Sequence, residues 1–370
     1  MRHVTDSPLV GKLCSPIKRL VVLLSVLGAS TVLLAVTNDD HTRLDHVIAH
    51  KTLTVVSVAG NTTHFNKDQF LYGFGYDLAR AYANDLNVTL KFKTVANAKL
   101  AFKAVRDGKA DIAMTTATPK QLEQSELTHL DLSCNDTAAL STHGLNPNVR
   151  WTFDTPNDPL TTSANGFVCQ KRQLGTTARM ATFYEQKTMQ SKYIRASFSQ
   201  NINDRLPLYK PVFQESAKQH RLDWQLLAAM GYQESMLDAT AVSPTGVSGL
   251  MMLTENTARE LGVIDRNDPT QSIQGGALYF KQLQRKYADV PASDRLWISL
   301  AAYNMGPGAV DQVRKKLRSK KQDPDSWVNI YQYLSDNAAK NSRFTQCMQY
   351  VTRIRTYLET IKQDRKLSRL

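Results

Sequence analysis

The segment Trp224–Ser235, with the sequence WQLLAAMGYQES, determines how the second half of the chain is expected to fold. Asp223 precedes this segment and can cap a helix, because its carboxylate can accept hydrogen bonds from the free N–H groups of the first turn. Leu227, Gly231 and Glu234 then fall on or near one face of that helix. The segment therefore predicts a helix whose last turn carries a carboxyl group along the apolar side.

A carboxyl group in such a position is suited to proton transfer. Burial removes hydration from the charged form, so it raises the pKa of Glu234 and keeps the group protonated near neutral pH. A protonated carboxyl group can donate its proton to the oxygen of a leaving group. The plain alternative is a surface glutamate at the end of a helix.

Residues 200–370 carry further helix signals, which together predict an all-α domain. N-capping residues, a proline in a first helical turn and terminating glycines recur through this part of the chain. One helix is expected to begin after Thr254 and to end at Gly262, and a second is expected to begin at Asp268-Pro269. A third is expected to begin at Ser293 and to end at Gly306-Pro307-Gly308. A last helix carries Tyr350, Val351, Ile354, Tyr357, Leu358 and Ile361. The segment Ala196–Asn203 is expected to be a linker in front of these helices.

Residues 41–199 alternate between strand-like and helix-like segments, which favours an α/β domain with a parallel or mixed sheet. The segment 119–148 is polar and rich in turn residues, and no element is assigned to it. The expected strands are Leu53–Val58, Val88–Phe92, Ala110–Thr115 and Trp151–Phe153, and the expected helices are Asp77–Asn87, Ala96–Asp107, Leu160–Gln173 and Thr177–Tyr184.

The first 40 residues are expected to be a signal peptide or a membrane anchor. Leu20–Val36 reads LVVLLSVLGASTVLLAV, an uncharged run that follows Lys18 and Arg19. A basic flank before an apolar run is typical of exported proteins, and positive charge is retained on the cytoplasmic side. The rest of the chain is therefore expected in the periplasm, in association with a membrane.

The chain of 370 residues has a net charge of +13, which favours anionic partners. The excess divides into +6 for residues 1–199 and +7 for residues 200–370, so neither half is a basic nucleic-acid-binding module. Export also makes nucleic acid an improbable partner. The run Arg314–Lys321 (RKKLRSKK) could contact anionic lipid or a wall polymer, or could be a solvated helix face.

The four cysteines, which lie far apart without a CxxC pair, do not indicate a metal cluster. Cys134 and Cys169 could form a disulfide in an oxidising compartment, which would leave Cys347 alone. Cys14 precedes the apolar run and should face the reducing side.

Three motifs closely resemble the catalytic domain of family 1 lytic transglycosylases, which has a lysozyme-like helical fold. They are GYQES at 231–235, AVSPTGVSGLMMLT at 241–254 and AAYNMGPG at 301–308. In the first half, GFGYDLA at 73–79 and DGKADIA at 107–113 resemble the first lobe of amino-acid-type solute-binding domains. This combination is similar to the membrane-bound lytic murein transglycosylase F family, and it implies a multidomain α+β chain with domains at 1–40, 41–199 and 200–370.

The resemblance implies cleavage of the β-1,4 bond between N-acetylmuramic acid and N-acetylglucosamine in peptidoglycan glycan strands, without water, leaving a 1,6-anhydro end. It assigns Glu234 as the acid and then the base, with no metal and no cofactor. The implied substrate contacts are Ser243, Met252, Tyr303, Asn304 and Tyr350. Met252 stands where many relatives have Gln, and the stretch before Tyr350 departs from the family pattern. Tyr303 and Asn304 could instead serve in packing and capping.

Two other functions are open at this point. One is a hydrolase of goose-lysozyme type on the same fold, and the other is a wall-binding or sensor protein without catalysis. Asp238 is the nearest alternative acid, but it is expected in a turn after the helix. The solute-binding part has PKQLE at 119–123 where relatives carry an arginine-bearing turn and a second lobe. A small-molecule ligand is therefore doubtful there, and weak or no binding of amino acids or muropeptides is expected.

Overall fold

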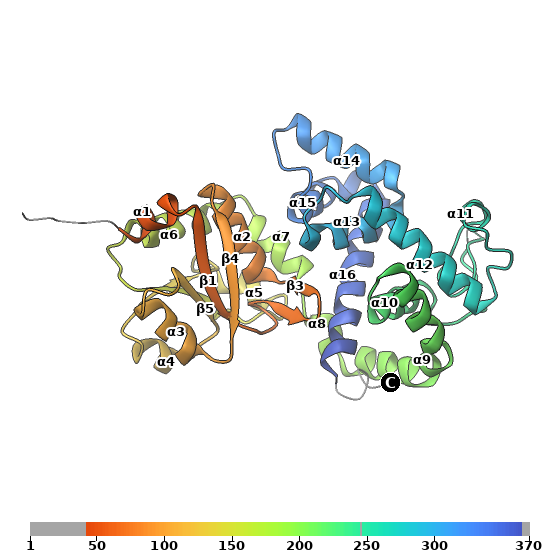
Figure 1. Cartoon of the computed structure of the whole chain (residues 1–370), viewed down its shortest axis with the longest axis horizontal. Coiled ribbons are helices and arrows are strands. Elements are labelled where there is room, and N and C mark those ends of the chain that lie inside the picture. The colour runs from red at the N-terminus through yellow and green to blue at the C-terminus, as the bar shows by residue number, and fades with distance from the viewer. Residues whose placement is uncertain (1–41, 245, 365–370) are drawn as a thin grey trace, which may run out of the picture. The chain divides into compact units, whose positions relative to one another are not determined.

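The computed structural model describes residues 42–244 and 246–364, which belong to one compact unit comprising His41–Leu370. The predicted leader lies outside the described residues. Within the described residues, no helix combines the length and apolar character needed to cross a membrane. Figure 1 shows an α/β part followed by a helical part, as the sequence predicts.

The α/β part is built on a mixed five-stranded sheet in the order β4-β1-β5-β7-β6. β4 and β5 run parallel to β1 on either side of it, whereas β7 is antiparallel to both β5 and β6. The strands are β1 (Thr52–Val58), β4 (Thr89–Val95), β5 (Ile112–Thr115), β6 (Thr128–Asp131) and β7 (Arg150–Phe153), and β2 (Phe65–Lys67) and β3 (Phe70–Tyr72) form a separate hairpin. The helices are α1 (Arg43–Ala49), α2 (Phe74–Asp85), α3 (Ala98–Arg106), α4 (Pro119–Glu123), α5 (Thr137–Ser141), α6 (Pro159–Gln173) and α7 (Thr176–Phe183).

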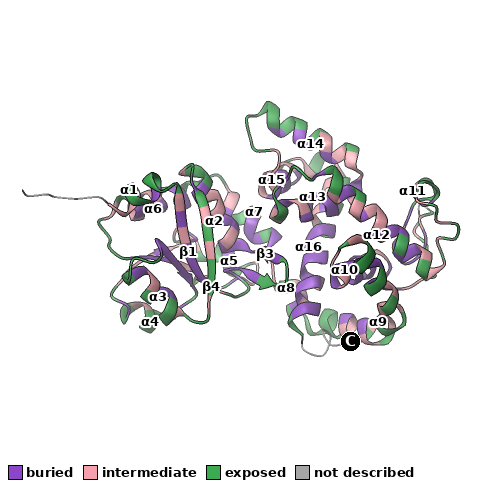
Figure 2. Ribbon diagram, in the orientation of Figure 1, coloured by how far each residue is buried: buried purple, intermediate pink, exposed green. Residues whose placement is uncertain are grey.

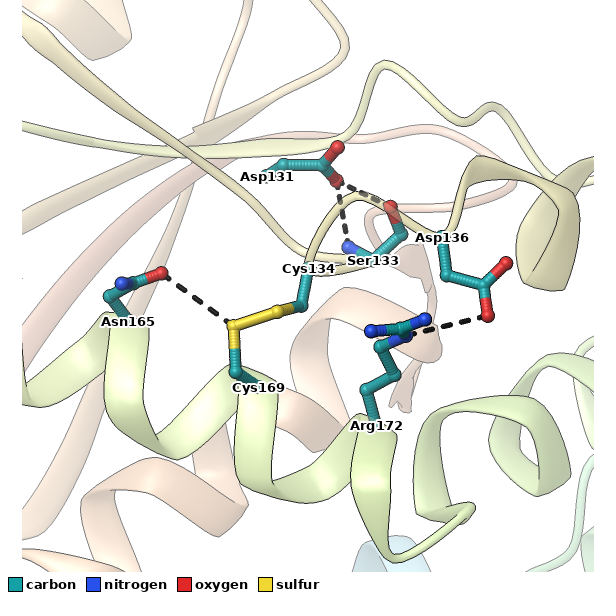
Figure 3. The surroundings of a disulfide bond; sticks show 7 residues. All are labelled: Asp131, Ser133, Cys134, Asp136, Asn165, Cys169 and Arg172. Atoms are coloured by element: carbon teal, nitrogen blue, oxygen red, sulfur yellow. Dashed lines mark hydrogen bonds and ion pairs between the residues drawn. A yellow bond between two sulfur atoms is a disulfide. The ribbon is translucent and has the colours of Figure 1, made fainter.

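The four predicted strands and four predicted helices of this part are confirmed within a few residues at their ends. The segment 119–148, which the sequence leaves unassigned, contains α4, β6 and α5. The possible disulfide is confirmed: Cys134, after β6, is bonded to Cys169 on α6 (Figure 3). Cys347 is a free, buried thiol.

The helical part packs around its last helix, which contacts α10, α13 and α15. Figure 2 shows α16 largely buried, and its buried side chains include Tyr350, Ile354 and Leu358. The elements are α8 (Lys187–Gln190), α9 (Lys192–His220), α10 (Trp224–Ser235), α11 (Glu255–Glu260), α12 (Pro269–Lys286), α13 (Ala292–Met305), α14 (Pro307–Ser319), α15 (Trp327–Asp336), a 3₁₀ turn (Ala338–Lys340) and α16 (Ser342–Gln363).

The predicted linker Ala196–Asn203 is wrong, because these residues lie inside α9. Phe198 and Ile202 are fully buried, so the segment is fixed by packing of its apolar face although most of its other residues are polar. α9 also contains Pro207 and Pro211, which remove backbone donors and ordinarily interrupt a helix. Contacts with α10 and α12 therefore override the local preference.

The basic run falls at the carboxyl end of α14. Arg314 is buried and forms ion pairs with Asp325 and Asp289. Lys315, Lys316 and the later cations of the run are exposed, as expected for the solvated face of a helix.

Candidate active site

Glu234 lies in the last turn of α10, where the predicted helix ends. The Asp223 side chain accepts a hydrogen bond from the Leu226 N–H and caps the amino end, as its position in the sequence predicts. Met236 takes a left-handed conformation, with φ of 55°, and ends the helix. Leu227–Met230 are fully buried, so the apolar body of α10 fixes the place of the carboxyl group. Glu234 itself remains partly accessible.

The Glu234 carboxyl group is hydrogen bonded to a tyrosine from the far end of the domain. The Tyr350 hydroxyl, on α16, donates to Glu234 Oε1 at 2.5 Å. Burial raises the pKa of Glu234 to about 8, and the Tyr350 hydrogen bond opposes this shift because it favours the charged form. The carboxyl group is therefore mainly protonated at neutral pH and has a donor ready to stabilise the carboxylate once the proton has left.

Tyr303 lies near the end of α13, close enough to Glu234 for the two groups to interact electrostatically. Its hydroxyl donates to the Met251 carbonyl at 2.9 Å, and its ring contacts Tyr279 with centroids 5.3 Å apart. Burial and the nearby Glu234 hold the pKa of Tyr303 well above its usual range. Tyr303 is therefore in the electrostatic neighbourhood of Glu234, whereas Asn304, at the next position, is exposed.

Ser235 connects α10 to the segment 249–252, which has the sequence GLMM and is called the GLM segment below. Its hydroxyl donates to the Leu250 carbonyl at 2.9 Å and to the Gly231 carbonyl at 3.2 Å. Leu250 and Met251 are fully buried. Gly249 has φ of +84°, and a Cβ there would lie 1.8 Å from the Arg266 carbonyl oxygen, so this turn requires glycine.

The GLM segment and the turn before it carry the two remaining predicted residues. Ser243 Oγ accepts a hydrogen bond from the Val247 N–H at 3.0 Å, so the hydroxyl shapes its own turn. Met252 is partly buried, with φ of 48°. The structure thus joins Tyr350 to Glu234 directly and Tyr303 to the Met251 carbonyl, and it holds Ser243 and Met252 on the loop that Ser235 anchors.

Asp238 is not equivalent to Glu234. It lies in the turn after α10, where the Thr240 N–H and hydroxyl both donate to its Oδ1, at 2.9 and 2.7 Å. These hydrogen bonds hold the pKa of Asp238 below its usual range. The group is therefore charged at neutral pH and is a poor proton donor.

Sequence reasoning assigned no separate role to Ser235 or Tyr279. Ser235 follows Glu234 directly in the GYQES motif, and this position is the only local feature of the sequence that points to a role for it near the site. Tyr279 carries no local signal, because only the packing of α12 against α13 brings it to Tyr303. No group of three or more His, Cys, Asp or Glu side chains in the described ranges could hold a metal ion.

Two cavities that do not include Glu234 are lined by residues of both the α/β part and the helical part. One, of about 200 Å³, is at the carboxyl ends of the parallel strands, where open α/β sheets bind ligands. There His64 is hydrogen bonded through Nδ1 to Ser57 at 3.0 Å and through Nε2 to Thr94 at 2.9 Å, so both ring nitrogens already have partners within the protein. The other, of about 650 Å³, includes in its lining the ion pair between the partly exposed Arg80 and the buried Asp294.

Comparison with known proteins identifies the helical part and the arrangement of the chain. Residues 211–326 match the family described as "Transglycosylase SLT domain". A membrane-bound lytic murein transglycosylase F of Alcanivorax borkumensis is 35% identical, over 74% of this chain and 60% of the relative. The chain is thus similar to proteins named membrane-bound lytic murein transglycosylase F. Relatives of the same name from Pseudomonas fluorescens and Ectopseudomonas mendocina are 32% and 29% identical, over 77% and 80% of this chain and 63% and 80% of their own lengths.

The chain spans about three fifths of the length of the first two of these relatives. The SLT match contains Glu234, Ser243 and Tyr303 but ends before Tyr350. In this chain, the hydrogen-bond donor to Glu234 therefore comes from a helix beyond the matched segment.

Proposed function

We propose that this chain is a peptidoglycan lytic transglycosylase that cleaves the N-acetylmuramic acid–β-1,4–N-acetylglucosamine bond and leaves a 1,6-anhydro end. The observation that supports this most directly is the isolated carboxyl group of Glu234. Its pKa is shifted by burial and by Tyr350, with no contribution from a second carboxylate of the described residues. A retaining glycosidase places a nucleophilic carboxylate about 5–5.5 Å from the acid, where it would raise the pKa of the acid further.

One carboxyl group is sufficient when the substrate supplies the nucleophile. Protonated Glu234 donates its proton to the glycosidic oxygen as the bond from C1 breaks, and the sugar's own 2-acetamido oxygen stabilises the developing cation. The Glu234 carboxylate then accepts the proton of the muramyl 6-hydroxyl, whose oxygen forms the new bond to C1. Glu234 ends the cycle protonated, and no water is consumed.

Tyr350 and the GLM loop have distinct parts in this proposal. The Tyr350 hydroxyl stabilises the Glu234 carboxylate between the two proton transfers, because a hydrogen bond to a charged acceptor is stronger than one to a neutral acceptor. We assign Ser243 to the acetamido group, and Met252, Tyr303 and Asn304 to the walls of the glycan site. No small-molecule ligand is proposed for the α/β part, whose described residues contain one five-stranded sheet and a hairpin but no second lobe.

The decisive experiment is digestion of purified peptidoglycan followed by mass spectrometry of the products. Anhydro ends are lighter by one water than the reducing muramic acid that a goose-type hydrolase would leave. Glu234→Gln should lower the rate by about 10³-fold, in the range of general acid–base catalysis. Asp238→Asn is the matched control and should stay within about twofold of the native rate.

Reducing ends would contradict the transglycosylase reaction, and full activity of Glu234→Gln would contradict the assigned acid. Absence of any product from the native chain, combined with binding to peptidoglycan, would instead support the wall-binding alternative. We further propose that the protein works in the periplasm beside a membrane, through its amino-terminal apolar segment, with glycan strands as its partner. Fractionation of cells expressing the full chain tests this placement.

A further inference from the structure

A fully buried arginine fixes the helix that supplies Tyr350. Arg355 lies on α16 and has no exposed surface. Its Nε donates to the Phe183 carbonyl at 3.1 Å, and its Nη2 donates to the Glu185 carbonyl at 2.7 Å. Its Nη1 donates to Glu359 Oε1 at 2.7 Å, which neutralises the charge within α16 itself.

These contacts attach α16 to the end of α7. Phe183 is the last residue of α7, and the last carbonyl groups of a helix have no partners within it, so Arg355 Nε supplies the donor that this carbonyl lacks. The Glu185 carbonyl belongs to the segment that follows α7. The plane of the guanidinium also lies near two aromatic rings, 5.7 Å from the centroid of Phe183 and 5.6 Å from that of Tyr184. The rigid fork of donors permits little rotation or sliding of α16 at this point.

Tyr350 is five residues before Arg355 on the same helix. Five residues correspond to a rise of about 7.5 Å and a rotation of about 140°, so the two side chains leave α16 on different sides. Tyr350 points to Glu234 on α10, whereas Arg355 points to the end of α7. A turn or shift of α16 of about 1 Å would therefore lengthen the 2.5 Å hydrogen bond that Tyr350 makes.

We infer that Arg355 is a positioning residue, which holds α16 in the register that delivers the Tyr350 hydroxyl to Glu234. The inference deepens the proposed function and rests on Glu234 as the acid. Arg355 does not touch the reacting atoms, and it acts only through Tyr350. The ion pair with Glu359 keeps the buried charge compensated, since a buried charge without a partner is costly.

The test is a double-mutant cycle with Arg355→Lys and Tyr350→Phe, measured as kcat on peptidoglycan across pH 5–10. Lysine keeps a positive charge for Glu359 but has no planar fork for two carbonyl groups. In the native background, Arg355→Lys should lower kcat at pH 6 by about tenfold. It should also move the alkaline limb of the plot of kcat against pH, where activity falls as Glu234 loses its proton, upward by about one pH unit. In the Tyr350→Phe background, it should change kcat by less than about twofold and leave the limb unmoved.

Arg314→Lys is the control, because Arg314 is also buried and ion-paired but lies on α14. It should lower the melting temperature without moving the alkaline limb. Equal losses of kcat in both Tyr350 backgrounds, or an unmoved limb in Arg355→Lys, would overturn the inference and leave Arg355 a purely structural residue. If Arg355→Lys does not fold, Glu359→Gln replaces it, with the same direction of shift expected. Retained activity of Glu234→Gln, by contrast, would overturn the proposed function itself.

Discussion

Replacement of Tyr350 by phenylalanine isolates one hydrogen bond of the site. The change removes only the hydroxyl that donates to Glu234 Oε1 at 2.5 Å, and it leaves the ring in place. The carboxylate then loses a donor that favours its charged form, so the pKa of Glu234 should rise further above its already raised value.

The size of this rise follows from the strength of the interaction. A hydrogen bond to a charged group contributes about 1.5–3 kcal/mol, and one pKa unit corresponds to about 1.4 kcal/mol. The pKa of Glu234, raised to about 8 in the native protein, should therefore increase by about one to two units in Tyr350→Phe. Because the protonated form is the active acid, activity is lost as pH rises through this pKa. The alkaline limb should consequently move upward, and kcat at pH 6 should fall by about tenfold, since the carboxylate left after proton transfer is less stable.

The assay is the rate of product formation from purified peptidoglycan at saturating substrate between pH 5 and pH 10, with products identified by mass. A limb that stays near its native position, or moves downward, would refute the assignment of Tyr350 as a donor to the catalytic carboxyl group. A loss of kcat without any such movement would have the same consequence.

Two further predictions concern the framework of the site. Ser235→Ala leaves the buried Leu250 carbonyl without its donor and should lower the free energy of unfolding by about 1–3 kcal/mol, measured by urea titration; an unchanged midpoint would exclude this anchoring role. Paired Cys134→Ser and Cys169→Ser changes open a loop of 35 residues and should lower the free energy of unfolding by about 3–4 kcal/mol, whereas kcat of the folded protein at 25 °C should not change. Equal stability of the native protein with and without a reductant would contradict the second prediction.

Local signals in the sequence were sufficient for much of the fold. The strands β1, β4 and β5 and the helices between them follow from short β-branched runs, helical periodicity and glycine stops. The Cys134–Cys169 disulfide remained one possibility among others, because spacing alone does not define which cysteines approach one another. The failures occur where packing over a distance outweighs local preference, as in α9, where burial of Phe198 and Ile202 makes a helix of a segment that reads as a linker.

The sequence by itself determined the position of the Glu234 carboxyl group on its helix. Asp223 predicts where α10 begins, and helical spacing from Leu227 places Glu234 on the apolar side, because the geometry of a helix relates residues three or four positions apart. Only the tertiary structure decided what surrounds that carboxyl group. Tyr350 lies 116 positions away, and its hydroxyl reaches Glu234 because α16 packs against α10 in one register. Arg355 helps to set that register through the carbonyl groups of Phe183 and Glu185, at and just beyond the end of α7. No local pattern contains this relation, since it depends on the packing of three helices together.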